Sequence, residues 1–314
     1  MKKLVVLSLV FISNMLFSQQ KVITYKVLDS ATKEPLVFAN VIFINKKTGT
    51  STDEEGSFSF LLNEAKNESV KVSYIGYQTK TVSLLQGTHT TIYLTKKSIG
   101  LNEVTVYALK DKKHKTINSF INKEYVGLGN FSGGQYPSTI ARWYDKPSKF
   151  ENQCFLNEIR ISFLDNDEEK DIPAKFRLRI LSVNKDGLPD DDLVYNNITL
   201  QRAVGKESLV VNLLPYKIEI PENGFYIAVE HLFIKENEFT EKRNVIVNDT
   251  VVYPNYKLVK YAPIFKGVLE EKYKNIKCYY LSLNGWKKMN TLDTSNKVFK
   301  NKILAPAFVV KFSD

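Results

Sequence analysis

Residues that carry much of enzyme chemistry are scarce in this 314-residue chain, which holds two cysteines, three histidines and two tryptophans. Nucleophilic hydrolysis needs a serine or cysteine beside a base, and His231 is the only histidine after residue 114. The sequence has neither a Gly-x-Ser-x-Gly turn nor a glycine-rich phosphate loop. A nucleophile would therefore have to be Cys154 or Cys278 beside His231, and the composition favours a protein that is not an enzyme.

The two cysteines lie in apolar, strand-like runs around Cys154 and Cys278. In an oxidising compartment they can form one disulfide, and buried free cysteine is also a common core residue. The sequence leaves both alternatives open.

Long apolar runs are absent except at the N-terminus. Lys2 and Lys3 precede a mostly apolar run from Leu4 to Phe17, and Ser18 offers a small residue for cleavage. This pattern predicts a signal peptide over residues 1–18, because the run is shorter than the roughly 20 residues of a membrane-spanning helix. An uncleaved anchor is the alternative. The protein is therefore expected to be exported, either periplasmic or secreted, and at most peripheral to the outer membrane.

The formal net charge is +10, which would suit a polyanionic partner. The lysines are scattered, however, and mixed with acids, as a solvated surface requires. We expect no nucleic-acid partner, because an exported protein seldom meets one.

Short β-prone runs alternate with turn residues from Lys21 to about residue 94. The clearest is the acidic turn Asp53 to Gly56, which leads into Ser57-Phe58-Ser59-Phe60, where the two phenylalanines share one face of a strand. Repeated short strands with turns between them predict a β-sandwich.

Several motifs in this part of the chain resemble the carboxypeptidase-regulatory-like domain. They are Val27-Leu28-Asp29, Glu34-Pro35-Leu36, Ala39-Asn40-Val41, Gly49-Thr50, Thr52-Asp53, Gly56-Ser57-Phe58 and Tyr74-Ile75-Gly76-Tyr77. The resemblance covers about residues 21–106 and implies a Greek-key β-sandwich at residues 19–108. It also implies a non-catalytic module, of a kind often found in envelope proteins of the Bacteroidetes type.

The family name makes a zinc carboxypeptidase worth testing. Such enzymes use a His-x-x-Glu pair and a later histidine as metal ligands. None of His89, His114 and His231 is followed by glutamate at that spacing, so the zinc ligand set is absent.

A charged stretch at Lys110–Lys115 suggests a linker over residues 109–130. Within it the segment 116–128 has Ile117, Phe120 and Ile121 at helical spacing, which predicts a short helix. Strand patterns resume after residue 137 and predict a second, larger, jelly-roll-like β-sandwich at residues 131–314. The run Phe176–Val183 alternates almost strictly, which buries Phe176, Leu178 and Ile180 and turns Arg177 and Arg179 to water or a partner.

Two acidic clusters, at residues 165–171 and 186–192, read as solvated loops. Oxygen ligands from Asp186, Asp190 and Asp192 could instead hold calcium, the one cofactor we consider. Paired carboxylates keep a glycoside hydrolase as a further alternative.

Aromatic residues on a strand face can bind sugars, and Trp143 and Trp286 are the candidates for ligand binding. The sequence thus predicts an all-β, non-catalytic binding or scaffolding module of the envelope, with an envelope protein or a glycan as partner. A carbohydrate-binding or carbohydrate-active sandwich is the alternative.

Overall fold

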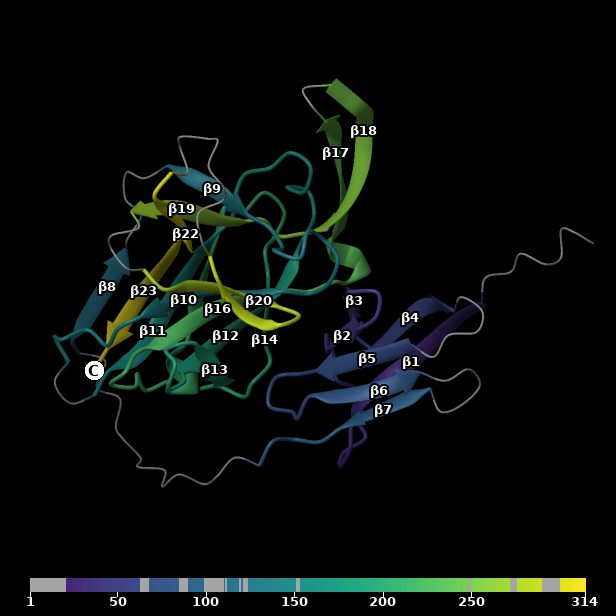
Figure 1. Ribbon diagram of the computed structural model, residues 1–314. Helices are drawn as coiled ribbons and strands as arrows, with labels where there is room; N and C mark the ends of the chain where they lie inside the picture. Colours follow the sequence, from purple (N-terminus) through teal and green to yellow (C-terminus); the bar gives the residue numbers. More distant parts are fainter. Residues whose placement is uncertain are drawn as a thin grey trace, which may run out of the picture.

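The computed structural model describes residues 21–62, 68–84, 90–98, 110, 112–118, 120, 124–150, 153–247, 250–271, 276–289 and 300–314. Apart from the short 3-10 helices η2 (Leu214–Tyr216) and η3 (Lys235–Asn237), the regular structure of these residues is β-strand (Figure 1). The all-β fold expected from the sequence is therefore confirmed. The signal peptide expected at residues 1–18 lies outside the described residues. No helix in the described part of the chain is long and apolar enough to cross a bilayer.

Two sheets form the first domain. One has the order β4-β1-β7, with β7 parallel to β1, and the other has the order β3-β2-β5-β6. The strands are β1 (Lys21–Asp29), β2 (Asn40–Phe43), β3 (Thr48–Ser51), β4 (Ser57–Leu62), β5 (Glu68–Ser73), β6 (Lys80–Leu84) and β7 (Thr91–Leu94). Buried side chains of both sheets, among them Val27, Phe58 and Val72, meet in one core, so the domain is a β-sandwich.

Polar side chains of the sequence motifs fix the turns of this domain. The Asp29 carboxylate accepts hydrogen bonds from the Tyr77 hydroxyl (2.6 Å) and from the N–H groups of Ala31 and Thr32. The Tyr77 hydrogen bond, helped by the two N–H groups, holds the pKa of Asp29 well below its usual range.

The turn expected at Asp53 to Gly56 is present, and the Asp53 carboxylate accepts hydrogen bonds from the N–H groups of Glu55 and Ser57. Gly56 has the positive φ that its turn requires (+69°). Gly49 has no room for a side chain, because a Cβ there would lie 2.7 Å from the carbonyl oxygen of Val41.

The second domain is built on two sheets that pack face to face. A seven-stranded sheet has the order β13-β12-β16-β10-β20-β21, with β14 also paired to β12, and a four-stranded sheet has the order β15-β11-β23-β8. A three-stranded sheet (β22-β19-β9) and a separate hairpin (β17-β18) complete the domain. The strands are β8 (His114–Asn118), β9 (Tyr125–Leu128), β10 (Thr139–Tyr144), β11 (Phe155–Ser162), β12 (Lys175–Val183), β13 (Pro189–Asp192), β14 (Ile198–Gln201), β15 (Ser208–Asn212), β16 (Phe225–His231), β17 (Glu238–Val247), β18 (Thr250–Tyr261), β19 (Phe265–Glu271), β20 (Cys278–Ser282), β21 (Gly285–Lys288), β22 (Lys302–Pro306) and β23 (Phe308–Ser313).

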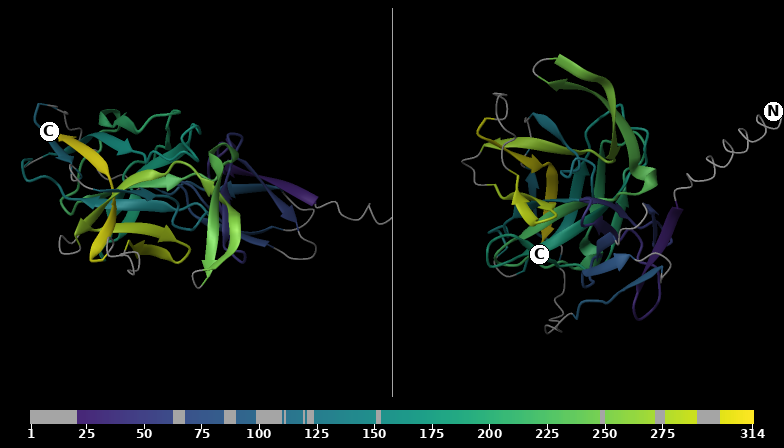
Figure 2. Two further views of the ribbon diagram at one scale, coloured as in Figure 1. Left: turned by 90° about the horizontal axis from the view of Figure 1, so that it is seen from above. Right: turned by 45° about the vertical axis from the view of Figure 1, so that its right-hand side comes forward.

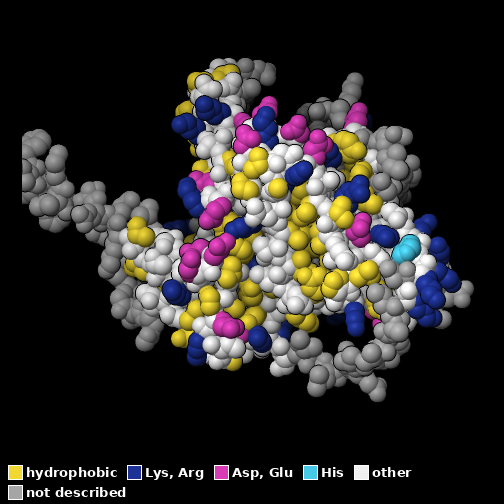
Figure 3. All heavy atoms as spheres, turned by 180° about the vertical axis from the view of Figure 1, so that it is seen from behind, with side chains coloured by type: hydrophobic (Ala, Val, Ile, Leu, Met, Phe, Trp, Pro, Cys, Tyr) yellow, Lys and Arg dark blue, Asp and Glu magenta, His cyan; other side chains and the backbone are white. Residues whose placement is uncertain are grey.

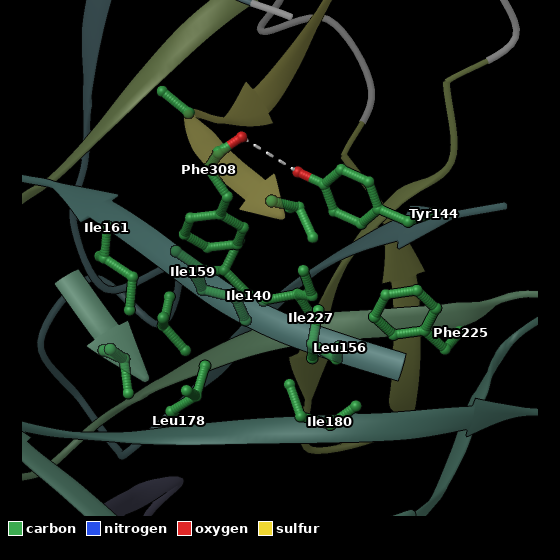
Figure 4. Packing of buried hydrophobic residues seen from close by; sticks show 14 of the residues in the cluster. Ile140, Tyr144, Leu156, Ile159, Ile161, Leu178, Ile180, Phe225, Ile227 and Phe308 are labelled. Atoms are coloured by element: carbon green, nitrogen blue, oxygen red, sulfur yellow. Dashed lines mark hydrogen bonds between the residues drawn. The ribbon is translucent and has the colours of Figure 1, made fainter. Parts of the chain in front are cut away.

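The main core lies between these two sheets (Figure 4). Leu178 and Ile180 of β12 point into it as the alternating pattern predicted, and they meet Leu156, Ile159 and Ile161 of β11 from the opposite sheet. Full burial of each such side chain contributes about 1.5–3 kcal/mol to folding, so this core is the main stabilising feature of the domain.

The helix expected over residues 116–128 is wrong for the described part of that segment. β8 begins at His114 and pairs with β23 of the second domain, where Ile117 lies opposite Val310. β9 pairs with β19. The segment expected as a linker over residues 109–130 therefore contributes two strands to the second domain. Apolar side chains at helical spacing can equally be buried by short strands, and pairing with distant strands decided the outcome.

Backbone hydrogen bonds join the two domains at β3. The N–H of Ser51 donates to the carbonyl oxygen of Phe233 (3.0 Å), and the N–H of Phe233 donates to the Ser51 hydroxyl (3.0 Å). Gly49 N–H donates to the carbonyl oxygen of Gln135 (2.7 Å). Buried Phe38 packs beside Leu232 and Ile234 at the same junction, so the first domain is docked by both polar and apolar contacts.

Candidate functional site between the two domains

The site is built on the outer face of the seven-stranded sheet. Strand alternation turns Arg177 and Arg179 of β12 to this face, because Phe176, Leu178 and Ile180 fill the core on the other. In the antiparallel pairing with β16, Arg177 lies opposite Glu230 and Arg179 lies opposite Ala228. The sequence predicted that the two arginines would face water or a partner, and the structure places them toward the first domain.

Four charged side chains form one chain of ion pairs on this face. Arg177 pairs with Glu230, and Arg179 reaches the same carboxylate (3.5 Å) as well as both oxygens of Asp192 (2.8 and 2.7 Å). Burial alone would raise the pKa of Glu230, but Arg177 and Arg179 outweigh it and hold that pKa below its usual value. Glu230 therefore stays ionised between two cations.

The Arg177 guanidinium also bridges the domains. Its Nη2 donates to the carbonyl oxygen of Phe38 (2.7 Å), its Nε donates to Asn197 (2.7 Å), and its centre lies 5.2 Å from the ring centroid of Tyr74. Only 1% of this side chain is exposed, so its charge depends on these partners rather than on water.

A cleft of about 210 Å³ opens beside this ion-pair chain, with walls from both domains. The first domain contributes Asn40, Lys71, Ser73, Tyr74, Ile75, Gly76, Tyr77, Thr79 and Lys97, and the second contributes Arg177, Arg179, Asp190, Asp192, Glu230, Leu281 and Trp286. An ion pair between Lys97 and Asp191 closes one side of the junction. The lining combines hydroxyl, carboxylate, ammonium and guanidinium groups with three aromatic rings, and the neighbouring part of the same sheet face adds further rings.

Aromatic side chains continue along the outer sheet face away from the cleft. Trp143 of β10, Tyr279 of β20 and Trp286 of β21 pack with buried Tyr226 around small residues of the sheet. Tyr226 and Tyr279 meet edge to face with their centroids 5.9 Å apart, and Lys277 Nζ lies 4.3 Å from the Trp143 ring centroid. Both tryptophans predicted as ligand-binding residues thus share one face, and Trp286 lines the cleft.

Gly224 controls the position of Trp143. Its φ is +79°, and a Cβ at this position would lie 2.5 Å from the carbonyl oxygen of Tyr144 and 2.7 Å from Nε1 of Trp143. We expect Gly224→Ala to lower the free energy of unfolding by about 1–3 kcal/mol and to change the tryptophan fluorescence. Urea denaturation followed by fluorescence measures both effects.

Gly187→Ala is the matched control, because Gly187 also has a positive φ (+76°) but no atom lies within 4 Å of the place that its Cβ would take. An equal loss of stability in both variants, without a fluorescence change in Gly224→Ala, would contradict the steric role of Gly224.

Two of the three aspartates predicted to bind calcium, Asp190 and Asp192, line the cleft, where Arg179 binds Asp192. Asp186 is exposed in the turn after β12. No three His, Cys, Asp or Glu side chains in the described ranges are placed to hold a metal ion.

The expectation that all acids of the two loop clusters are solvated is wrong for Glu169 and Asp192, which are buried. Burial raises the pKa of Glu169, although its ion pair with Arg202 opposes the shift. Neither Glu169 nor Arg202 lines the cleft, so this pair stabilises the loop before β12.

Cys154 and Cys278 are both buried and are free thiols in the structure. Burial raises the pKa of each thiol to about 12, so neither is a thiolate near neutral pH. The two cysteines therefore act as core residues here rather than as nucleophiles.

Sequence reasoning missed the partners of the two arginines. Asn40 and Tyr74 belong to family motifs that were interpreted as structural, yet both line the cleft. The one signal available was the pair of arginines within a strand of otherwise apolar character, since such charges need partners when the strand lies inside a sheet.

Comparison with known proteins identifies the first domain only. Residues 23–106 match the family model of the CarboxypepD_reg-like domain, which confirms the resemblance drawn from the motifs. No curated protein matches the chain. The family match includes the cleft residues of the first domain but none of the cleft residues of the second domain.

Proposed function

We propose that this chain, whose first domain is a CarboxypepD_reg-like domain, is a non-catalytic binding protein of the bacterial envelope that holds a glycan at the cleft between its domains. The observation that carries the proposal is the shared face of Trp143, Tyr279 and Trp286, which leads into a polar cleft. The proposal makes both domains part of one binding site.

A sugar ring presents an apolar face of C–H groups and an edge of hydroxyl groups. The aromatic rings of Tyr279 and Trp286 offer surfaces for the first, and the charged and hydroxyl groups of the cleft offer donors and acceptors for the second. Planar guanidinium and carboxylate groups form directional hydrogen bonds, so they can orient a bound sugar as well as attract it. A cleft of about 210 Å³ suits one sugar unit, with the rest of the glycan extending along the aromatic face.

The charge state of the cleft supports binding rather than turnover. Glycoside hydrolysis requires a carboxylic acid that keeps its proton near neutral pH, through a raised pKa. Burial raises the pKa of Glu230, but Arg177 and Arg179 lower it, and the net pKa lies below the usual value. Glu230 would therefore be ionised and unable to act as the acid.

The envelope location is supported by the N-terminal sequence, in which Lys2 and Lys3 precede the apolar run Leu4–Phe17. An exported binding protein would meet polysaccharides and the exposed parts of envelope proteins. A scaffolding role toward another envelope protein is the alternative within the same proposal, and the experiment below distinguishes the two.

Replacing Trp286 by alanine is expected to weaken glycan binding about tenfold, because the ring borders the cleft that would hold the terminal sugar. Trp143→Ala is expected to weaken only longer oligosaccharides, since Trp143 does not line the cleft but lies on the same face. A glycan array selects the ligand, and calorimetric titration with an oligosaccharide series of increasing length measures both effects.

Tyr216→Ala serves as the control, because this exposed tyrosine lies in η2, just after strand β15, and is not part of the aromatic face. The glycan proposal fails if the unmodified protein retains no glycan at micromolar concentration, or if Trp286→Ala binds as tightly as the unmodified protein. Release of a shortened product during the titration would show an enzyme instead.

A further inference from the structure

The β17–β18 hairpin stands apart from the sheets of the second domain. Its two strands pair only with each other among the described strands, and it projects from the body of the molecule (Figures 1 and 2). The first eight residues of β18, from Thr250 to Lys257, are all exposed. The outer part of β18 therefore leaves most of its side-chain surface exposed.

Apolar side chains gather in this outer part. The distal patch consists of Val251, Val252, Tyr253 and Tyr256, whose exposed fractions are 47%, 45%, 60% and 49%. The rings of Tyr253 and Tyr256 lie 6.4 Å apart. Exposed apolar side chains that lie together mark an interaction surface more often than single ones do.

The distal patch occupies both faces of the hairpin. Val251, Val252 and Tyr253 are consecutive residues of β18 and all are exposed. Successive side chains of a strand point to opposite faces, so apolar groups are exposed on both. A protein partner that packs on one face would leave the other in water. A lipid interface surrounds an inserted hairpin on every side, and it can cover both.

Basic side chains follow the distal patch toward the body. Lys242 and Lys257 are directly opposite each other and exposed, and Arg243 lies opposite Tyr256. Figure 3 shows this order, with hydrophobic side chains toward the outer end of the projecting hairpin and lysine or arginine below them. Two like charges facing each other across strands are unfavourable unless an anion lies between them or beside them.

The root of the hairpin is fixed, so that its outer part is presented in a defined direction. Tyr261 stacks on Phe233 with a centroid distance of 3.8 Å. Buried Asn237 accepts a hydrogen bond from the N–H of Lys175 and donates to the carbonyl oxygens of Lys175 and Leu232. The free part is thus carried on a rigid base.

We propose that this hairpin binds the surface of an anionic lipid bilayer. The valines and tyrosines of the distal patch enter the interfacial region, where tyrosine is favoured because it has an apolar ring and a polar hydroxyl. Lys242 and Lys257 then lie at the level of the lipid phosphate groups, whereas Arg243 already pairs with Glu241. This placement relieves the repulsion between the two lysines and covers apolar side chains on both faces of the hairpin.

Sedimentation of the full chain with lipid vesicles tests the proposal. We expect binding to vesicles of phosphatidylglycerol and phosphatidylethanolamine, weaker binding in high salt, and little binding to phosphatidylcholine alone. The triple variant Val251→Ser, Val252→Ser, Tyr253→Ser should partition at least about tenfold less. The double variant Lys242→Gln, Lys257→Gln should partition roughly 25-fold less to anionic vesicles, at about fivefold for each cation.

Matched controls remove the same residue types elsewhere. Val204→Ser, Val210→Ser, Tyr93→Ser removes two valines and one tyrosine that are exposed outside the hairpin, and Lys185→Gln, Lys206→Gln removes two exposed lysines. All variants should melt within a few degrees of the unmodified protein, because the altered side chains are exposed.

The proposal is overturned if the hairpin variants bind anionic vesicles as well as their controls do, or if the unmodified protein binds none. A concentration-dependent dimer that the triple variant abolishes would instead identify a second copy of the chain as the occupant. Trp286→Ala should bind vesicles normally, so failure here and failure of the glycan proposal are separate results.

Discussion

Replacing Arg177 by alanine is expected to lower the free energy of unfolding by about 3–5 kcal/mol. The substitution leaves the buried Glu230 carboxylate without its nearest cation, and it leaves the Phe38 carbonyl oxygen without its donor. A buried charge that loses one partner costs far more than the original pair contributed, because the remaining group has also lost its water. The first domain should be held less firmly as well, since Arg177 is a direct link to it.

Urea denaturation at neutral pH measures this loss, and Lys175→Ala is the matched control. Lys175 lies on the same strand and also reaches the first domain, through an ion pair with Glu54, but both side chains are partly exposed (22% and 65%). Such a pair contributes at most about 1 kcal/mol. Losses of similar size in the two variants would show that burial of the Arg177 pair is not what stabilises the junction.

A double replacement distinguishes the contribution of the Arg177–Glu230 ion pair from that of the other contacts of Arg177. Arg177→Met with Glu230→Met removes both charges and fills similar space with apolar groups, so no unpaired charge is left by either change. We expect a smaller loss than for Arg177→Ala alone. The remaining loss would report the contacts of Arg177 with Phe38 and Asn197, which methionine cannot make.

Local patterns were sufficient to predict the parts of the fold that depend on neighbouring residues. The alternation in Phe176–Val183 gave the correct inner and outer faces of β12. The turn at Asp53 to Gly56 was predicted from its acidic residues and its glycine, and in the structure the Asp53 carboxylate accepts backbone N–H groups of this turn. Both features rest on interactions within a few residues of chain or on the two-residue period of a strand.

Long-range contacts were beyond this reasoning. Arg177 meets Phe38, which lies 139 residues earlier in the sequence, and no local pattern specifies that distance. The same limit explains the wrong helix over residues 116–128, because Ile117 is paired with Val310 of a strand nearly two hundred residues away. No prediction was made for the exposed valines and tyrosines of β18, because no local pattern shows that this strand leaves the body of the protein.

A loss of stability in mild acid is the second large effect expected. His231 is fully buried at the end of β16, with its ring edge against Phe265 (centroids 5.1 Å apart). Burial lowers the pKa of His231 to about 4, and nearby backbone oxygens oppose this only in part. The unfolded chain has the ordinary histidine pKa of about 6.5. Between these two values the unfolded chain binds a proton that the folded protein does not bind, so stability falls as the pH falls.

The expected loss relative to pH 7.5 is about 2 kcal/mol at pH 5 and about 3 kcal/mol at pH 4, after which His231 contributes little further change. Glu230 acts in a different window: its lowered pKa stabilises the fold above about pH 4.5, and that contribution is lost only below this pH. Urea denaturation at several pH values between 7.5 and 5 therefore separates the effect of His231 from that of Glu230. The raised pKa of Glu169 acts in the opposite direction, because a proton that the folded protein retains favours folding as the pH falls. His231→Leu should give a nearly flat profile over this range, and a slope equal to that of the unmodified protein would show that another group is responsible. Exposed His114 provides the control for replacing a histidine by leucine outside the core.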